Sequence, residues 1–242
     1  MKRLNKFTSV LGENWVVGRY LLPELRRLGQ AQNGALLDLA CGESPFRSFF
    51  PKVGAYLRVD RNALDSEVTP GDMLAIPLAN GSVDAVLLFQ AITDVPNPVD
   101  VLKEARRVLR PGGRLLVFES MAYPEHDAPH DFYRLMPEGL RMLGADAGLE
   151  LRECIRLGGL FTRFATLWST FLMGGLKAHA VLRPIAHLGV VCGNLLCYGL
   201  DRLAPHPHLA SDYLAVLTFD GTTQALSPPS LGIAKNMQRV TA

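Results

Sequence analysis

The chain has 242 residues, of which 48% are hydrophobic, and its formal net charge is +2. This length suits one α/β domain with an elaboration, and it is sufficient for a full hydrophobic core. So small a net charge, without a long basic run, argues against a protein that binds nucleic acid. No apolar segment of the signal-peptide kind follows the basic N-terminal residues, so we expect a cytoplasmic protein.

An amphipathic helix is expected near the N-terminus. Residues 11–29 have the required spacing, with Leu21 and Leu25 among the expected core contacts. Pro23 lies where it would divide this helix into two pieces. We therefore expect residues 1–34 to form a helical cap on the rest of the chain.

A glycine turn follows the first expected strand. Residues 35–39 are an apolar run that holds one acid, Asp38, and the run stops shortly before Gly42. Ser44 is a good N-cap for a helix that we predict over residues 44–50. In a parallel sheet such a turn lies at the carboxyl end of a strand, where ligands bind. A glycine there lets the backbone approach a ligand closely.

The second expected strand, residues 55–60, ends in an acid, Asp60, which Arg61 follows. An acid at this strand tip is placed to hold a ribose, because one carboxylate can accept hydrogen bonds from two vicinal hydroxyls. A glycine turn followed by a tip acid at this spacing suggests a cofactor that contains a nucleoside.

Further motifs follow in order, and the whole set resembles the class I S-adenosylmethionine-dependent methyltransferases, in the group of the ubiquinone and menaquinone methyltransferases. The resemblance covers about residues 35–150, and its motifs are residues 37–42, 59–60, 71–73, 76–78, 82–86 and 109–115. The segment from His130 to Arg134 is also similar to members of this family found with surface-polysaccharide and lipid genes.

The pattern of strands and helices favours a parallel sheet, because βαβ units recur along the chain. Strands are expected near residues 35–39, 55–60, 68–72, 82–89, 114–119, 149–157 and 211–219, and helices over 98–109 and 137–147. The resemblance implies a Rossmann-like α/β fold, with a seven-stranded, mostly parallel sheet and helices on both faces. It also implies an antiparallel last strand inserted between the fifth and the sixth. The methyltransferase core would comprise residues 35–157 and 211–220.

The resemblance also implies the cofactor, S-adenosylmethionine, and the residues that bind it. These are Asp38, Ala40, Gly42, Asp60, Arg61, Asp72, Met73, Gln90 and Ala91. Asp60 would hold the ribose, Asp72 and Met73 the adenine, and the remaining strand-tip residues the methionine end. For Asp72, an aspartate that caps a turn is the alternative interpretation.

Many relatives carry a glutamate–histidine pair where this chain has Thr93 and Asp94, so an obvious histidine base is missing at that position. The loop after the fifth strand offers replacements. Its predicted catalytic residues are His130, Asp131 and Tyr133, with His130 or Asp131 as the base if one is needed.

Two histidines and two acids in this loop, His126, Asp127, His130 and Asp131, could together supply a general base. They also allow two other interpretations. One is a metal site and the other is an ordered polar loop. We expect no metal.

Residues 158–210 form an apolar helical insertion before the last strand. Two uncharged runs, 164–176 and 185–200, are each shorter than the about 20 apolar residues that a spanning helix needs. One interpretation is helices in a membrane interface, with peripheral contact on the inner face of the membrane. A second interpretation is a helical lid, or a dimer surface that would make the protein an oligomer. A third is a helix that spans the bilayer. The tail, residues 221–242, is expected to be flexible.

The sequence therefore predicts an S-adenosylmethionine-dependent methyltransferase that acts on a lipophilic or lipid-linked small molecule, by O-methylation rather than at carbon or nitrogen. A quinone-modifying enzyme that acts on a prenylated ring is one alternative. A non-catalytic, membrane-associated partner protein that binds the cofactor is another, and the missing glutamate–histidine pair would suit it.

Overall fold

The structure of the chain is a computed structural model that describes residues 7–43, 45–62, 65–121, 123–126, 128–176 and 181–221. Three of the expectations above concern residues outside these ranges. They are the helix cap at Ser44, the loop residue Asp127 and the tail from residue 222 onward.

Seven strands form one mixed sheet in the order β3-β2-β1-β4-β5-β7-β6. They are β1 (Gly34–Leu39), β2 (Val53–Asp60), β3 (Val68–Pro70), β4 (Val83–Phe89), β5 (Leu109–Ser120), β6 (Glu150–Leu157) and β7 (Asp212–Phe219). The neighbouring strands β3, β2, β1, β4 and β5 pair parallel to one another. Strand β7 lies between β5 and β6 and pairs antiparallel with both. This confirms the predicted Rossmann-like fold with an antiparallel last strand.

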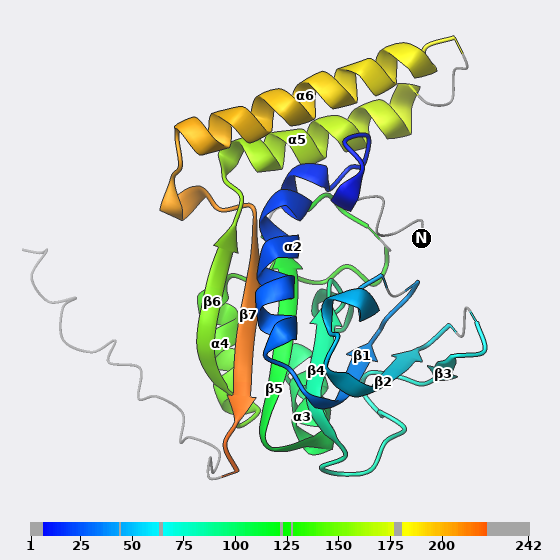
Figure 1. Cartoon of the computed structure of the whole chain (residues 1–242), viewed down its shortest axis with the longest axis vertical. Coiled ribbons are helices and arrows are strands. Elements are labelled where there is room, and N and C mark those ends of the chain that lie inside the picture. The colour runs from blue at the N-terminus through cyan, green and yellow to red at the C-terminus, as the bar shows by residue number, and fades with distance from the viewer. Residues whose placement is uncertain are drawn as a thin grey trace, which may run out of the picture.

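Helices cover both faces of the sheet, with α2 on one face and α3 and α4 on the other (Figure 1). The longer helices are α2 (Trp15–Gln30), α3 (Pro98–Val108), α4 (Pro137–Asp146), α5 (Leu160–Phe171) and α6 (Arg183–Leu203). Short helical turns are η1 (Arg47–Phe49), η2 (Ile92–Asp94), η3 (Leu172–Leu176) and η4 (Pro207–Leu209).

The core is divided by the sheet because successive strand residues point to opposite faces. Leu36 packs with Leu21 and Leu25 of α2, whereas its neighbour Leu37 packs in the cluster on the other face, with Leu102 of α3. The apolar run of β1 is therefore buried on both sides, as expected of a central parallel strand.

The predicted helix over residues 44–50 is wrong, because the structure has only the single 3-10 turn η1 there. Pro51 ends the segment, and so few residues cannot repay the nucleation of an α-helix. The N-terminal helix begins at Trp15 and continues through the exposed Pro23 as one helix, so the proline does not divide it. Strand β5 begins at Leu109, earlier than predicted.

The insertion folds into a helical hairpin, in which α5 and α6 pack against each other. Figure 1 shows this hairpin across the end of the sheet toward which β5 and β6 point. Asp201 of α6 binds the start of α5, where its carboxylate accepts hydrogen bonds from the backbone N–H groups of Gly159, Phe161 and Thr162 at 2.7–3.0 Å. This carboxylate satisfies donors that the first turn of a helix leaves unpaired.

The hairpin is also tied to the N-terminal segment. The fully buried Asn194 donates from Nδ2 to the carbonyl oxygens of Val10 at 2.8 Å and Gly12 at 3.3 Å. Its Oδ1 accepts from Ser169 Oγ of α5 at 3.2 Å. Within the described residues, no helix combines the length and hydropathy that crossing a bilayer requires.

Candidate functional site

A cleft of about 580 Å³ lies at the carboxyl ends of the central strands. Its volume falls within the roughly 300–1,000 Å³ of small-molecule sites. The strand order reverses between the neighbours β1 and β4, and in open α/β sheets ligands bind at this kind of crevice. The cleft is therefore where the fold itself places a ligand.

Most predicted cofactor residues meet in this cleft. Its walls include Asp38, Ala40, Gly42, Asp60, Arg61, Met73, Gln90 and Ala91. The remaining predicted residue, Asp72, is not in the wall. Its Oδ1 accepts from the N–H of Leu74 at 2.9 Å, and its Oδ2 lies 3.4 Å from Arg61 Nη2. This is the turn-capping geometry of the alternative interpretation, so an adenine contact through Asp72 stays a prediction.

The backbone turns sharply at two neighbouring strand tips. After β1, Ala40 and Gly42 have φ angles of 54° and 53°, and after β4, Gln90 has a φ of 54°. Such angles are unfavourable for residues with a side chain and cluster at functional sites. Here they turn the backbone of both tips along the wall of the cleft.

Asp60 is held in place at the tip of β2. Its Oδ2 accepts from the N–H of Gly42 at 2.7 Å, and its Oδ1 accepts from the N–H of Asn62 at 2.8 Å. Each carboxylate oxygen has a second lone pair, so both can still accept from a vicinal diol. The residues present therefore fit the ribose of a nucleoside.

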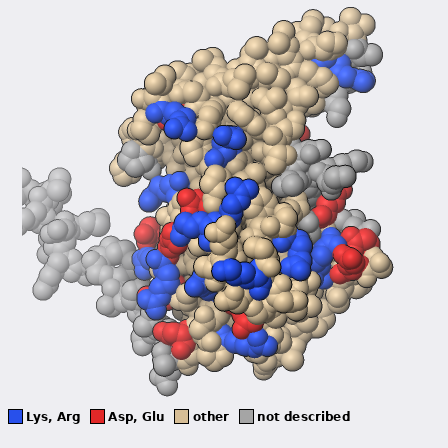
Figure 2. Space-filling view, viewed as in Figure 1, with Lys and Arg blue, Asp and Glu red and all other residues tan. Residues whose placement is uncertain are grey.

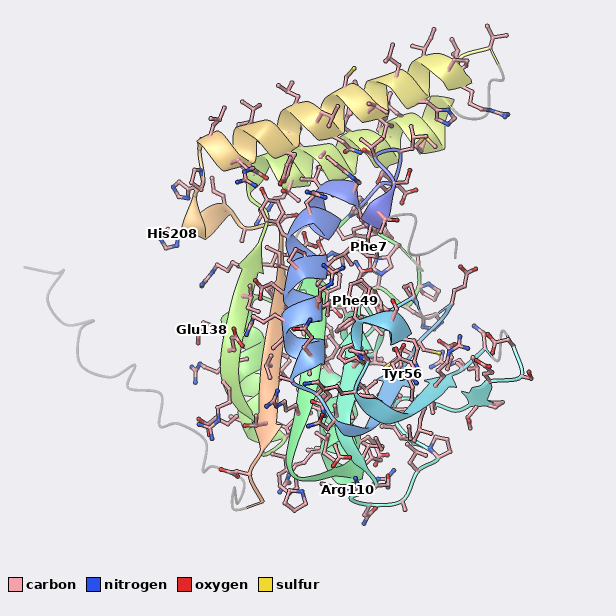
Figure 3. All side chains as sticks on the ribbon, viewed as in Figure 1. Phe7, Phe49, Tyr56, Arg110, Glu138 and His208 are labelled. Atoms are coloured by element: carbon pink, nitrogen blue, oxygen red, sulfur yellow. The ribbon has the colours of Figure 1, made fainter. Side chains whose placement is uncertain are left out.

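Asp38 places a second carboxylate beside the β1 turn. Asp38 is 3% exposed, and its Oδ2 accepts a hydrogen bond from the hydroxyl of Tyr56 at 2.6 Å. Tyr56, labelled in Figure 3, comes from the neighbouring strand β2. An anionic group in the cleft wall suits the ammonium end of an amino acid, as the predicted methionine end requires.

The N-terminal segment closes one side of the cleft through Phe7 and Asn14. Figure 3 shows Phe7 between the hairpin and the sheet, and its ring lies 6.3 Å from that of Phe46 and 6.4 Å from that of Phe118. A Cβ at Gly18 would lie 2.2 Å from the Phe7 carbonyl oxygen, so the glycine is what lets this segment lie against α2. The N-terminal segment therefore supplies part of the cleft wall.

The predicted catalytic residues occupy different positions. His130 is exposed and lines the cleft, whereas Asp131 and Tyr133 do not line it. The Arg134 guanidinium donates to both carboxylate oxygens of Asp131 and holds its pKa well below the usual range. The Tyr133 hydroxyl donates to the Pro96 carbonyl at 2.7 Å. Direct roles for Asp131 and Tyr133 in proton transfer stay predictions without support from this geometry.

Glu119 was missed by the sequence analysis. This fully buried residue lies near the end of β5 in the cleft wall, and its Oε1 accepts from the N–H of Ala91 at 3.0 Å. Burial raises its pKa to about 8. An acid at the end of an apolar run, the same signal that marked Asp60, could have identified it.

His126 and Asp94 are also in the wall of the cleft. The imidazole ring of His126 lies beside the carboxylate of Asp94, with Nε2 at 3.5 Å from Oδ1. Within the described part of the chain, no three side chains of His, Cys, Asp or Glu come together as a metal ion would need.

Known proteins share this core. A family model described as a methyltransferase domain matches residues 37–117. The ubiquinone/menaquinone biosynthesis C-methyltransferase UbiE of Dinoroseobacter shibae is 42% identical over 69 residues, which are 28% of each chain. The thiol S-methyltransferase TMT1B of Homo sapiens is 34% identical over 125 residues, 44% of this chain and 51% of that protein. This chain thus spans about half, or less, of these curated relatives.

A solved structure, that of the cyclase SpnF, has the same fold, with a TM-score of 0.53 and 17% identity over 80% of each chain. The matched family model, the strand order and the strand-tip motifs agree. Residues 37–117 therefore match a methyltransferase domain, and the resemblance to class I S-adenosylmethionine-dependent methyltransferases is confirmed for this part of the chain. S-adenosylmethionine is the cofactor of this class.

Replacing Asp60 tests the ribose assignment. Asp60→Ala removes a charged acceptor for two hydroxyls, and because hydrogen bonds to charged groups contribute about 1.5–3 kcal/mol, affinity should fall by about ten- to a hundredfold. Calorimetric titration with S-adenosylhomocysteine measures the change. Glu67→Ala, an exposed acid after the same strand, is the control. Equal affinity in the Asp60 variant and the wild type would contradict the assignment.

The raised pKa of Glu119 predicts that the free energy of unfolding depends on pH. Between its ordinary pKa of 4.5 and its folded pKa of about 8, the folded protein keeps a proton that the unfolded chain releases. The free energy of unfolding therefore falls as pH rises through this window, by up to about 1.4 kcal/mol per pH unit. Glu119→Gln should have a smaller loss between pH 5 and pH 8 in urea unfolding.

The exposed Glu138→Gln on α4 is the control for this experiment. Asp212, whose pKa burial raises to about 6, is present in all three proteins, and its charge adds to the rise in the pKa of Glu119. The same loss of stability with pH in the wild type and in Glu119→Gln would show that Glu119 is ionised throughout.

Proposed function

We propose that the protein transfers the methyl group of S-adenosylmethionine to an oxygen of a lipophilic or lipid-linked small molecule. The observation that carries this proposal is the apolar hairpin, which lies at the same end of the sheet as the cleft (Figure 1). A lid or surface built from apolar helices favours an acceptor with an apolar part, since burial of apolar surface is the main gain in binding it.

When bound, S-adenosylmethionine supplies a methyl group that is already electrophilic, so the protein mainly aligns the two substrates and accepts a proton. Asp60 holds the ribose and Asp38 the methionine end. The turns at Ala40, Gly42 and Gln90 bring backbone close to the same ligand. His130, exposed at the cleft, is placed to contact the acceptor.

Methylation of a quinone ring is the second candidate. The relative from Dinoroseobacter shibae is named as a ubiquinone/menaquinone C-methyltransferase, and its aligned segment is 42% identical. A prenylated ring would also suit the apolar hairpin. The human relative is named for methylation of thiols, so the relatives differ in the acceptor atom.

We further propose that the hairpin contacts a membrane surface. Exposed apolar residues form a stripe along both helices, at the spacing of a single helix face: Phe164, Leu167, Trp168 and Phe171 on α5, and Ile185, Leu188, Leu195 and Leu196 on α6. An exposed apolar patch of this extent marks an interaction site. Figure 2 shows the hairpin as a mostly uncharged surface, with basic residues toward its ends.

Charge identifies the expected partner of this apolar stripe. The sequence from 158 to 210 contains four basic residues, Arg163, Lys177, Arg183 and Arg202, and one acid, Asp201. Asp201 is buried and bound to the start of α5. The net positive charge of this segment, together with its apolar stripe, complements a lipid surface with anionic head groups.

Transfer of labelled methyl tests the enzymatic proposal. The purified protein is incubated with methyl-labelled S-adenosylmethionine and an extract of membrane lipids, and label is expected in the organic phase. The mass of the product distinguishes an O-methylated lipid from a C-methylated quinone. Saturable cofactor binding without any transfer would contradict an enzymatic role and favour a non-catalytic partner protein.

Vesicle binding tests the membrane proposal. Replacing Phe164, Phe171 and Leu188 together by serine should reduce binding to anionic vesicles at least tenfold, because each buried apolar side chain contributes about 1.5–3 kcal/mol. Met142→Ser, at an exposed position on α4, should leave sedimentation with vesicles unchanged. Unchanged vesicle binding by the triple variant would contradict the proposal. A wild-type protein that is dimeric, with a triple variant that is monomeric, would also contradict it.

A further inference from the structure

His126 lies in the cleft wall between carboxylates from two different parts of the chain. Its Nε2 is 3.5 Å from Oδ1 of Asp94, which belongs to η2 after β4. Its Nδ1 is 3.4 Å from Oδ2 of Asp131, which follows it in the loop after β5. The fold therefore brings Asp94, which is distant in sequence, against a histidine and an acid of one loop.

The carboxylate of Asp131 is fixed as an anion beside this ring. It accepts two hydrogen bonds from the Arg134 guanidinium and a third from the backbone N–H of His126 at 3.0 Å. The Nδ1 atom of His126 is enclosed and has no hydrogen-bond partner of good geometry among the described residues. The imidazole thus lies between two carboxylates, at 3.4 Å from Asp131 and 3.5 Å from Asp94. Because Arg134 holds Asp131 in place as an anion, we assign the ring hydrogen of neutral His126 to Nδ1.

This tautomer leaves a lone pair on Nε2, which faces Oδ1 of Asp94. The Nε2 lone pair then lies 3.5 Å from Oδ1 of Asp94, which also accepts from the Thr93 hydroxyl at 3.4 Å. Such a pair of acceptors is stabilised by a group that brings a hydrogen to it. A hydroxyl of the methyl acceptor is such a group, and Nε2 is the basic atom of the pair.

We propose that His126 is the catalytic base of the methyl transfer, with Asp131 and Asp94 as its positioning residues. This inference rests on the proposed function. As the acceptor oxygen forms its bond to the methyl carbon, its proton passes to Nε2. The electron pair of the broken carbon–sulfur bond stays on sulfur, which becomes a neutral thioether. The imidazolium is then stabilised by the two carboxylates.

His130 is the rival base. It is exposed, and its ring lies 6.5 Å from that of Phe132. Among the described residues, no carboxylate forms an ion pair with its ring. A base that no carboxylate orients is free to rotate, and the loss of orientation lowers its efficiency in proton transfer.

The test compares His126→Ala, His130→Ala and the exposed His208→Ala, which Figure 3 labels far from the cleft. Rates are measured as label transferred to the membrane lipid extract, and cofactor affinity is measured in parallel. His126→Ala should lose about 10²–10⁴-fold in rate and keep its affinity for S-adenosylhomocysteine within twofold. Added imidazole should restore part of this rate, which a purely structural role would not allow. His208→Ala should match the wild type.

The positioning role of Asp131 has its own readout. Asp131→Asn should lower kcat with little change in KM. Nitrogen NMR of histidine-labelled protein should show hydrogen on Nδ1 of the neutral His126 ring in the wild type, and on Nε2 in the variant. Hydrogen on Nε2 in the wild type would overturn the inference.

The outcomes separate this inference from the function on which it rests. If the wild type labels no lipid, the proposed function is contradicted, and so is the assignment of His126 as its base. If the wild type labels lipid and His126→Ala is within threefold of it, the inference alone is overturned. Loss and imidazole rescue in His130→Ala instead would assign the base to His130.

Discussion

The reversal of strand order between β1 and β4 is the constraint on which the site depends. The chain leaves these two neighbouring strands toward different parts of the sheet, so a crevice opens between their tips. The left-handed turns at Ala40, Gly42 and Gln90 shape its walls. The hydrogen bond from Gly42 to Asp60 then joins the tip of β2 to the same turn. A nucleoside-sized site follows from this topology, with few side chains required.

The hairpin is coupled to this site through the N-terminal segment. Asn194 of α6 holds the carbonyls of Val10 and Gly12, and the same segment supplies Phe7 and Asn14 to the cleft wall. A surface on which the hairpin docks would therefore lie close to the cover of the cleft.

Local patterns in the sequence predicted the strands and the strand-tip residues Gly42 and Asp60 that line the cleft, because each of these depends on a strand and the turn directly after it. The apolar run around Asp38 and the acid Asp60 at the tip of β2 are examples. The helix expected over residues 44–50 was wrong because a segment this short before Pro51 does not repay the nucleation of an α-helix, and the described residues form only the turn η1. Asp72 was ambiguous for a related reason, since a turn and a ligand site require the same residue type.

The arrangement around His126 was not predictable from local patterns. Asp94 and His126 are separated by α3 and β5, and only the tertiary fold places them 3.5 Å apart. Asp131 was predicted as a catalytic residue on its type alone, and its pairing with Arg134 is visible only in the structure. The sequence also left open what the apolar runs of the insertion contact, because apolar helices pack on each other or on another surface.

A crystal structure of the protein with S-adenosylhomocysteine tests the central claim most directly. The account predicts that the ribose hydroxyls lie within hydrogen-bond distance of Asp60, with the amino acid end at the turns after β1 and β4. A ligand bound elsewhere, or strand tips filled by side chains at saturating ligand, would contradict it.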